Sequence, residues 1–259
     1  VDYMIIGQGL AGSAIALQLL KLRKRILVID QPNHNTSSRI AAGLFNPITG
    51  RKMLKTWMAD KLFPYLHRHY LSVEALTGTR FYYPLPLYRP FLSIEEQNEW
   101  MSKSVEKEYV PYIEKVSPRP AYSGVNDVYG GMLLKQCGYL DTTCYLSSVR
   151  RLIERGGTFL EARAAENELI VQPEGVKYKN FEADKVIFCN GTQQNGLFDW
   201  LPIRALKGET LKIKSSLDKE LIINRGVYMV PLTEEGEWRV GATYNIKDET
   251  PLATEFARL

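Results

Sequence analysis

The sequence predicts an α/β (α+β) protein with two interleaved domains, one built on a parallel sheet and the other on a mixed antiparallel sheet. Three observations carry this prediction. Two apolar runs, residues 3–6 and 26–30, flank a glycine-rich turn and a helical pattern, and together they indicate a β-α-β unit. A further apolar run at residues 185–191 ends in Asn-Gly, as a buried strand does before a turn. Residues 204–244 show short runs separated by turn residues, which are typical of antiparallel strands.

The glycine-rich turn has the pattern Gly-x-Gly-x-x-Gly, formed by Gly7, Gly9 and Gly12. In such a pattern the first glycine permits a tight turn, the second lets the backbone approach a pyrophosphate, and the third lets the helix lie close to the sheet. The helix N-terminus adds free N–H groups and a partial positive charge. Asp30, 18 residues beyond Gly12, is placed to accept a hydrogen bond from a ribose hydroxyl. The pattern therefore predicts a Rossmann-like dinucleotide site.

Each of these features also has an ordinary structural explanation. Glycines mark turns that bind nothing, and an acid at the end of a strand is commonly solvated. Here the strand before the turn, the helix after it and the terminal acid are all present, which favours the nucleotide site. Because an acid at position 30 disfavours a 2′-phosphate, NADP is not expected as the ligand.

The first half of the chain continues with a segment, residues 37–50, that is rich in small residues and glycine. A helix is expected from residue 51 to about 76, with Trp57 on its core face. From 81 to 120 the sequence becomes aromatic and proline-rich, with a short helix near 94–104. This change in composition indicates the first part of a second domain.

Further elements are expected along the second half: a helix at 142–155 and strands at 158–162, 169–172, 209–214, 226–231 and 237–244. Because nucleotide-type and mixed segments alternate along the chain, each domain is expected to be discontinuous. We assign residues 1–80 and 136–203 to the nucleotide-binding domain, and residues 81–135 and 204–259 to a substrate domain.

The composition is that of an ordinary globular protein, with 45% hydrophobic and 24% charged residues. The net charge of +4 is too small to predict a nucleic-acid surface. Cys137, Cys144 and Cys189 form neither an even set nor a CxxC pair, so they predict free thiols and no metal site. No apolar run approaches the roughly 20 residues that span a bilayer, and no cationic stretch precedes the first strand as in a signal peptide. A cytoplasmic location is therefore expected.

Four segments form a series with a characteristic order and spacing: residues 7–12 with Asp30 behind them, residues 37–50, residues 184–191, and residues 226–231 followed by 240–243. Together they resemble the FAD-dependent D-amino-acid oxidase and glycine oxidase superfamily, in particular a bacterial branch of it. The resemblance spans most of the chain.

The resemblance implies FAD as the cofactor and the oxidation of a small amine or amino acid. In that chemistry a hydride passes from the substrate to flavin N5, the resulting imine hydrolyses, and the reduced flavin is reoxidised by oxygen or another acceptor. No protein acid or base is required. The three histidines, His34, His67 and His69, are accordingly not expected to be catalytic.

The resemblance also implies which residues bind the flavin. Small side chains of residues 37–50 are expected to lie against the isoalloxazine, and residues 184–191 to close over the cofactor. Residues 37–39 are expected at a phosphate or ribose, with loop capping as the alternative. Asn46 is expected to hydrogen-bond the ring, or else to cap the turn before Pro47. The expected set is Gly7, Gly9, Leu10, Ala11, Gly12, Asp30, Gln31, Ser37, Ser38, Arg39, Ala41, Ala42, Gly43, Leu44, Asn46, Asn190 and Gly191.

Two residues are candidates for orienting the substrate. Tyr228 matches the family's carboxylate-binding tyrosine, although an aromatic residue packing across strands is an equal alternative. Arg51 stands at an expected helix start, where a cation is unfavourable, so it predicts a bound anion. That partner is an anionic substrate or the N1–C2 carbonyl edge of the flavin, and a solvated helix start is the alternative. The chain ends at Leu259 before the family's G-x-R-P motif, so we expect the flavin domain to lack its last strand and helix.

Other functions remain open at this point. A flavin domain acting in tRNA base modification predicts a basic, aromatic surface, which the small net charge supports poorly. An NAD-dependent dehydrogenase leaves residues 37–50 unexplained, and a non-catalytic flavin-binding protein is the third alternative. A membrane or nucleic-acid partner is not expected. The sequence does not specify the amine, the electron acceptor or the oligomeric state.

Overall fold

The computed structural model describes residues 1–31, 33–50, 53–164, 168–192, 198, 200–248 and 250–258. Its first sheet is parallel throughout, in the order β11-β2-β1-β15. The four strands are β1 (Tyr3–Ile6), β2 (Ile26–Asp30), β11 (Thr158–Glu161) and β15 (Lys185–Phe188). The central strands β1 and β2 are almost entirely buried, as expected of a parallel sheet that is covered on both faces.

Alternate side chains of β1 enter two different cores, because successive residues of a strand point to opposite faces. Ile5 packs with residues of helices α1 (Leu10–Lys21) and α5 (Thr142–Gly156). Met4 and Ile6 instead pack against a three-stranded antiparallel sheet on the other face. That small sheet consists of β12 (Leu169–Gln172), β13 (Gly175–Tyr178) and β14 (Phe181–Ala183).

The second large sheet has seven strands in the order β16-β19-β18-β17-β7-β9-β8, and every pairing is antiparallel except that of β17 with β7. Its strands are β7 (Leu87–Pro90), β8 (Ile113–Ser117), β9 (Gly131–Leu134), β16 (Thr210–Lys214), β17 (Ile222–Arg225), β18 (Val227–Pro231) and β19 (Glu237–Gly241). Helix α4 (Ile94–Lys103) follows β7, and Ser93 caps it by accepting a hydrogen bond from the Glu96 amide. The sheet therefore combines strands from two distant parts of the chain.

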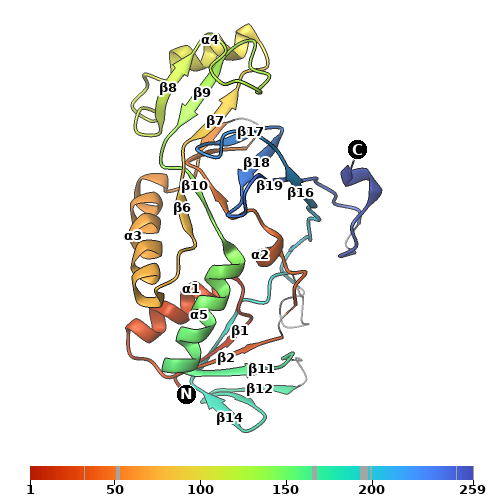
Figure 1. Ribbon diagram of the computed structural model, residues 1–259. Coiled ribbons are helices and arrows are strands. Elements are labelled where there is room, and N and C mark those ends of the chain that lie inside the picture. Colours follow the sequence, from red (N-terminus) through yellow and green to blue (C-terminus); the bar gives the residue numbers. More distant parts are fainter. Residues whose placement is uncertain are drawn as a thin grey trace.

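The two sheets are connected by crossing segments (Figure 1). β6 (Tyr82–Pro84) and β10 (Gly138–Leu140) pair with each other and run between the parallel sheet and β7–β9. β10 also pairs with β3 (Leu44–Phe45), which ties residues 37–50 to this connection. The remaining elements are α2 (Ser37–Ile40), β4 (Ile48–Thr49), β5 (Leu54–Lys55), α3 (Ala59–Thr77) and the 3-10 helix η2 (Glu255–Arg258).

The predicted fold class is confirmed, but the start of one helix is wrong. α3 begins at Ala59, preceded by Met58 in the left-handed region, and β5 occupies part of the expected first turn. Trp57 therefore lies outside the helix, and 78% of its surface is exposed, contrary to the expected core position. The sequence favoured an earlier helix start because apolar residues recur at helical spacing from residue 53 onward.

Candidate active site

The glycine turn after β1 is packed so tightly that side chains cannot enter it. Gly7 has φ of +97°, and a Cβ there would come within 2.5 Å of the Cys189 carbonyl oxygen. A Cβ on Gly12 would lie 1.9 Å from the Gly7 carbonyl oxygen. These contacts bring the start of α1 and the end of β15 against the same turn, at the carboxyl edge of the sheet, where α/β folds bind ligands.

The N-terminus of α1 has the properties of an anion site. Gly9 stands at the N-cap without a capping side chain, and the first turn contains no acid. The Leu10 amide donates to Ser38 Oγ at 3.2 Å, and a Cβ on Gly9 would meet that same hydroxyl at 2.9 Å. Ser38 of α2 is thereby held beside the turn. The partial positive charge of the helix N-terminus and the adjacent hydroxyl suit a diphosphate.

Asp30 lies at the carboxyl end of β2, next to the turn. Its backbone carbonyl accepts a hydrogen bond from the Ala162 amide, which continues the pairing with β11. Among the described residues, the Asp30 carboxylate has no hydrogen-bonding partner, so it is available to a ligand hydroxyl. Gln31 and Ser37, which follow β2, are exposed, as is Gly191 after β15, which has φ of +68° with open space around its α-carbon.

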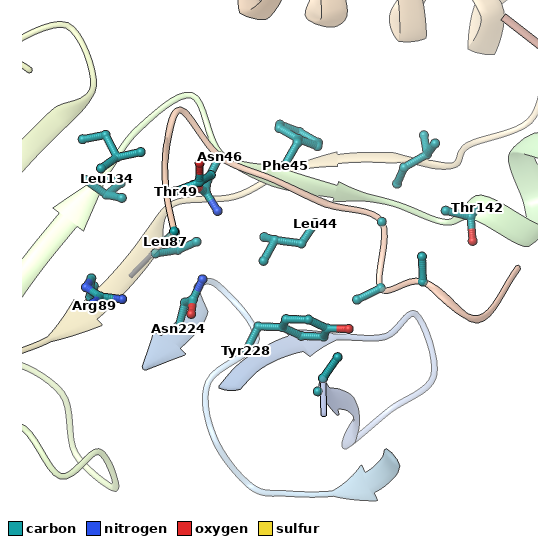
Figure 2. Close-up of a pocket in the computed structure, with 18 of the residues that line it drawn as sticks. Leu44, Phe45, Asn46, Thr49, Leu87, Arg89, Leu134, Thr142, Asn224 and Tyr228 are labelled. Carbon is teal, nitrogen blue, oxygen red and sulfur yellow. The ribbon is translucent and has the colours of Figure 1, made fainter. Parts of the chain in front are cut away.

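A cavity of about 1040 Å³ lies between residues 41–50 and the seven-stranded sheet (Figure 2). Residues 41–50 form one wall, held by a pairing of Gly43 with Leu140, whose amide donates to the Gly43 carbonyl at 3.0 Å. A Cβ on Gly43 would lie 2.0 Å from the Leu140 carbonyl oxygen, so this position requires glycine. Leu10, Ala41, Ala42, Gly43, Leu44, Asn46 and Tyr228 are the expected site residues that line the cavity.

Asn46 has a polar atom that the protein leaves unsatisfied. The residue is 9% exposed, and its Oδ1 is buried without a hydrogen-bond partner among the described residues. Buried polar atoms of this kind are unusual and are costly unless a ligand satisfies them. Asn46 lines the cavity, where a side-chain amide fits a ligand with polar ring atoms.

The opposite wall is a row of residues on neighbouring strands. Asn224 of β17 is directly paired with Tyr228 of β18, which is paired in turn with Gly241 of β19. Leu87 of β7 is paired with Ile222, so Arg89 continues the row beside Asn224. Figure 2 shows Arg89, Asn224 and Tyr228 side by side and Leu44 facing them across the cavity.

Tyr228 is half-buried, and burial raises the pKa of its phenol while Arg239 opposes the rise. The hydroxyl therefore stays protonated at neutral pH and can donate a hydrogen bond. A Cβ on Gly241 would lie 3.0 Å from this hydroxyl, so the glycine makes room for the ring.

Arg89 is a site residue that sequence reasoning missed. Among the described residues that line the cavity, it is the one with a charge. Burial, followed by the nearby Arg225, lowers the pKa of its guanidinium, which nevertheless stays charged at neutral pH. The available signal was Leu87-Tyr88-Arg89, because alternation in a strand places an arginine on the same face as a buried leucine.

The other expected residues that the structure describes, including the exposed Gln31, Ser37 and Gly191, do not line the cavity. Gly7, Gly9, Gly12, Asp30 and Ser38 gather at the turn and strand ends. Ala11, Arg39 and Asn190 are described but do not line the cavity, and Arg51 lies outside the described residues. The described part of the chain contains no group of three or more His, Cys, Asp or Glu side chains suited to a metal. Within the same part, no helix is long and apolar enough to cross a bilayer.

Comparison with known proteins identifies the family of this chain. Residues 2–259 match the model of the DAO family, described as FAD dependent oxidoreductase. The bifunctional protein ThiO/ThiG of Synechocystis sp. is 24% identical over 276 aligned residues, covering 96% of this chain. The chain spans 40% of the length of that relative.

Solved structures show the same fold at low identity. Glycine oxidase from Bacillus cereus has a TM-score of 0.71 at 17% identity, with 99% of this chain and 75% of that one covered. Iminodiacetate oxidase from Chelativorans sp. has a TM-score of 0.79 at 14% identity, with coverage of 99% and 76%. L-proline dehydrogenase from P. horikoshii has a TM-score of 0.71 at 16% identity, with coverage of 99% and 74%.

The match extends over nearly the whole chain, and the glycine turn, the uncapped helix terminus and the unsatisfied Asn46 oxygen fit a flavin dinucleotide. This protein belongs to the DAO family of FAD-dependent oxidoreductases.

Proposed function

We propose that the protein oxidises a small amine or amino acid with FAD as the electron acceptor. The observation that carries this proposal is the cavity itself, in which residues 41–50 face a row of polar side chains on the seven-stranded sheet. When bound, FAD supplies a two-electron acceptor whose N5 takes a hydride from the carbon that bears the amine, leaving an imine that water hydrolyses. Oxygen is the proposed final acceptor.

The chain's own residues would hold the cofactor at two places. The uncapped N-terminus of α1, with Ser38 beside it, is suited to the diphosphate, and the Asp30 carboxylate to a ribose hydroxyl. Asn46 Oδ1 is suited to accept a hydrogen bond from the ring. The close packing of Gly43 on Leu140 keeps the backbone of this wall free of side-chain bulk.

The substrate would lie on the sheet side of the cavity. The Tyr228 phenol, protonated because burial raises its pKa, is suited to donate a hydrogen bond to a substrate carboxylate. Arg51, outside the described residues, remains a proposed second orienting group. We also propose the division into a flavin domain, residues 1–80 and 136–203, and a substrate domain, residues 81–135 and 204–259.

The visible spectrum tests this proposal. The purified protein is expected to be yellow, or to become so with added FAD, and the flavin bands are expected to bleach when an oxidisable amino acid is added without oxygen. Readmission of air should restore the bands if oxygen is the acceptor. A protein that binds no FAD would contradict the proposal. Bound FAD that no amino acid or amine reduces would instead indicate a non-catalytic flavin protein.

A further inference from the structure

A buried charge cluster lies behind one end of the cavity. The Arg225 guanidinium donates to both carboxylate oxygens of Glu96, at 2.9 Å each. Arg89 Nη2 lies 3.7 Å from Glu96 Oε1. The three side chains are only 13% to 19% exposed. Two guanidinium groups and one carboxylate leave a net positive charge in a place that water reaches poorly.

Glu96 makes its hydrogen bonds to Arg225 and forms only a longer ion pair with Arg89. Its carboxylate receives the bidentate pair from Arg225 and a further hydrogen bond at 2.8 Å from the Leu92 amide. Arg89 lies beyond hydrogen-bonding distance of that carboxylate, and its buried Nε has no partner in the described part of the chain. A buried guanidinium without hydrogen bonds is costly, so the arrangement calls for an anion.

The uncompensated charge faces the cavity. Arg89 lines it together with Asn224, whose side chain also lacks a hydrogen-bonding partner among the described residues, and Figure 2 shows the two next to each other. Leu87 and Leu134 surround them in the cavity wall. In such apolar surroundings a charge-assisted hydrogen bond is stronger than in water.

This end of the cavity is separate from the Tyr228 hydroxyl. That hydroxyl lies over Gly241 on β19, on the side of β18 away from Arg89. Tyr228 and Arg89 stand on β18 and β7, two strand spacings or about 10 Å apart, and the Tyr228 ring points away from Arg89 toward β19 (Figure 2). The Tyr228 hydroxyl and the Arg89 guanidinium therefore offer separate positions for two carboxylates.

We propose that Arg89 and Asn224 form a subsite for a second acidic group, so that the substrate is an amine with two carboxylates, such as an amino dicarboxylate. One carboxylate binds near Tyr228, and the other binds in the subsite of Arg89 and Asn224. This inference rests on the proposed function of the same cavity, and it adds the substrate class.

A binding measurement tests the subsite without turnover. Succinate, an unreactive dicarboxylate, is titrated by calorimetry into the FAD-loaded full chain, with its uncharged diamide as a comparison. The wild type is expected to bind succinate and not the diamide. Arg89→Gln should weaken succinate binding at least about tenfold, because a charge-assisted contact is lost. The exposed Arg119, changed to Gln, is the matched control and should change nothing.

A second variant, Glu96→Gln, is expected to change succinate affinity in the opposite direction. Glu96→Gln removes the one negative charge of the cluster, so succinate should bind more tightly than in the wild type. Arg89→Lys keeps the charge and should retain part of the affinity if Arg89→Gln does not fold. If the cluster had only a structural role, Arg89→Gln and Glu96→Gln would both lower the stability of the protein. They would then not change succinate affinity in opposite directions. Equal affinity of the wild type and Arg89→Gln would overturn the subsite.

Turnover separates this inference from the proposed function. DL-aspartate and DL-asparagine differ by one charge, and the ratio of their kcat/KM values should fall in Arg89→Gln. If the flavin is reduced by neutral amino acids and this ratio is the same in both proteins, the subsite is wrong and the proposed function stands. If no amine reduces the flavin but succinate binding depends on Arg89, the subsite stands and the proposed function is wrong.

Discussion

The glycines of the first turn are required for two different reasons. At Gly7 and Gly12 a side chain would collide with backbone carbonyls of the protein itself, at 2.5 Å and 1.9 Å. At Gly9 the nearest obstacle is a movable hydroxyl, Ser38 Oγ, at 2.9 Å. The close approach of a ligand is therefore the stronger reason for glycine at position 9, whereas packing alone explains the other two.

Asn46 allows ligand binding to be separated from stability. Replacing Asn46 by Leu removes an unsatisfied buried oxygen, which costs about 1–3 kcal/mol in a typical protein. We expect the melting temperature of the FAD-free protein to be unchanged or raised. The same change should weaken FAD binding, because the flavin ring loses the hydrogen-bond acceptor that Asn46 provides. Calorimetry on the FAD-free protein and a fluorescence titration with FAD measure the two effects.

Thr49→Val is the matched control for Asn46→Leu. Thr49 also lines the cavity, but its hydroxyl lies 3.3 Å from the Thr56 hydroxyl and is thus already paired. The Thr49→Val variant should therefore bind FAD with an affinity close to that of the wild type. A clear loss of stability in FAD-free Asn46→Leu would mean that the side chain caps the turn before Pro47.

At the scale of elements, α3 carries two histidines in surroundings that oppose their charge. Burial lowers the pKa of His67 and of His69, and Lys21 adds to the effect at His69. His67 contacts the Tyr82 hydroxyl, and the His69 ring stacks on Tyr65. Both rings therefore pack against aromatic neighbours, and the lowered pKa values favour their neutral forms at pH 7.

These pKa shifts predict a loss of stability in mild acid. Because the folded-state pKa is below the ordinary value of 6.5, the unfolded chain binds more protons as the pH falls below about 6.5. The stability contribution is present above that pH and is lost as the pH falls through the lowered pKa. We expect the melting temperature to fall between pH 7.5 and about pH 5.

Variants of α3 test the source of this pH dependence. His69→Phe keeps an aromatic ring beside Tyr65 and should make the fall in melting temperature smaller. His34 is exposed, so His34→Gln should leave the pH dependence as in the wild type. An identical pH dependence in His69→Phe and the wild type would assign the effect to other groups.

Three strands were not predicted from the sequence, because their formation depends on distant partners rather than on a local pattern. β8 and β9 lie within or after the aromatic, proline-rich stretch, and β17 is a short strand between two predicted ones. Their pairings join residues far apart in the chain, as when Leu87 pairs with both Ile222 and Leu134. Such strands form because partners are available, and a local pattern does not contain that information.

At the scale of the whole molecule, Arg239 connects the two sheet regions. From β19 its guanidinium donates to the carbonyl oxygens of Ala41 at 2.9 Å and Ile40 at 3.4 Å. It therefore ties the start of the cavity wall, at residues 40 and 41, to the seven-stranded sheet. Gly43, paired with Leu140, holds the same wall two residues further on.

We expect Arg239→Met to weaken FAD binding by about tenfold, because two carbonyl groups lose a charged donor and the wall loosens. Titration of FAD by fluorescence measures the change, and far-UV circular dichroism should be that of the wild type. Lys212→Met is the control, because Lys212 is exposed on the neighbouring strand β16 and pairs with Glu237. Unchanged affinity in Arg239→Met would mean that the pairing of β3 with β10 alone holds the wall.

The sequence by itself determined the β-α-β unit and the family. These features are local: the glycines, the flanking apolar runs and Asp30 are close together in the chain, and each has a recognisable physical requirement. Only the tertiary structure decided which polar groups face residues 41–50 across the cavity. Arg89, Asn224 and Tyr228 meet because β7, β17 and β18 are neighbours in one sheet, and strand order depends on packing between segments separated by more than a hundred residues.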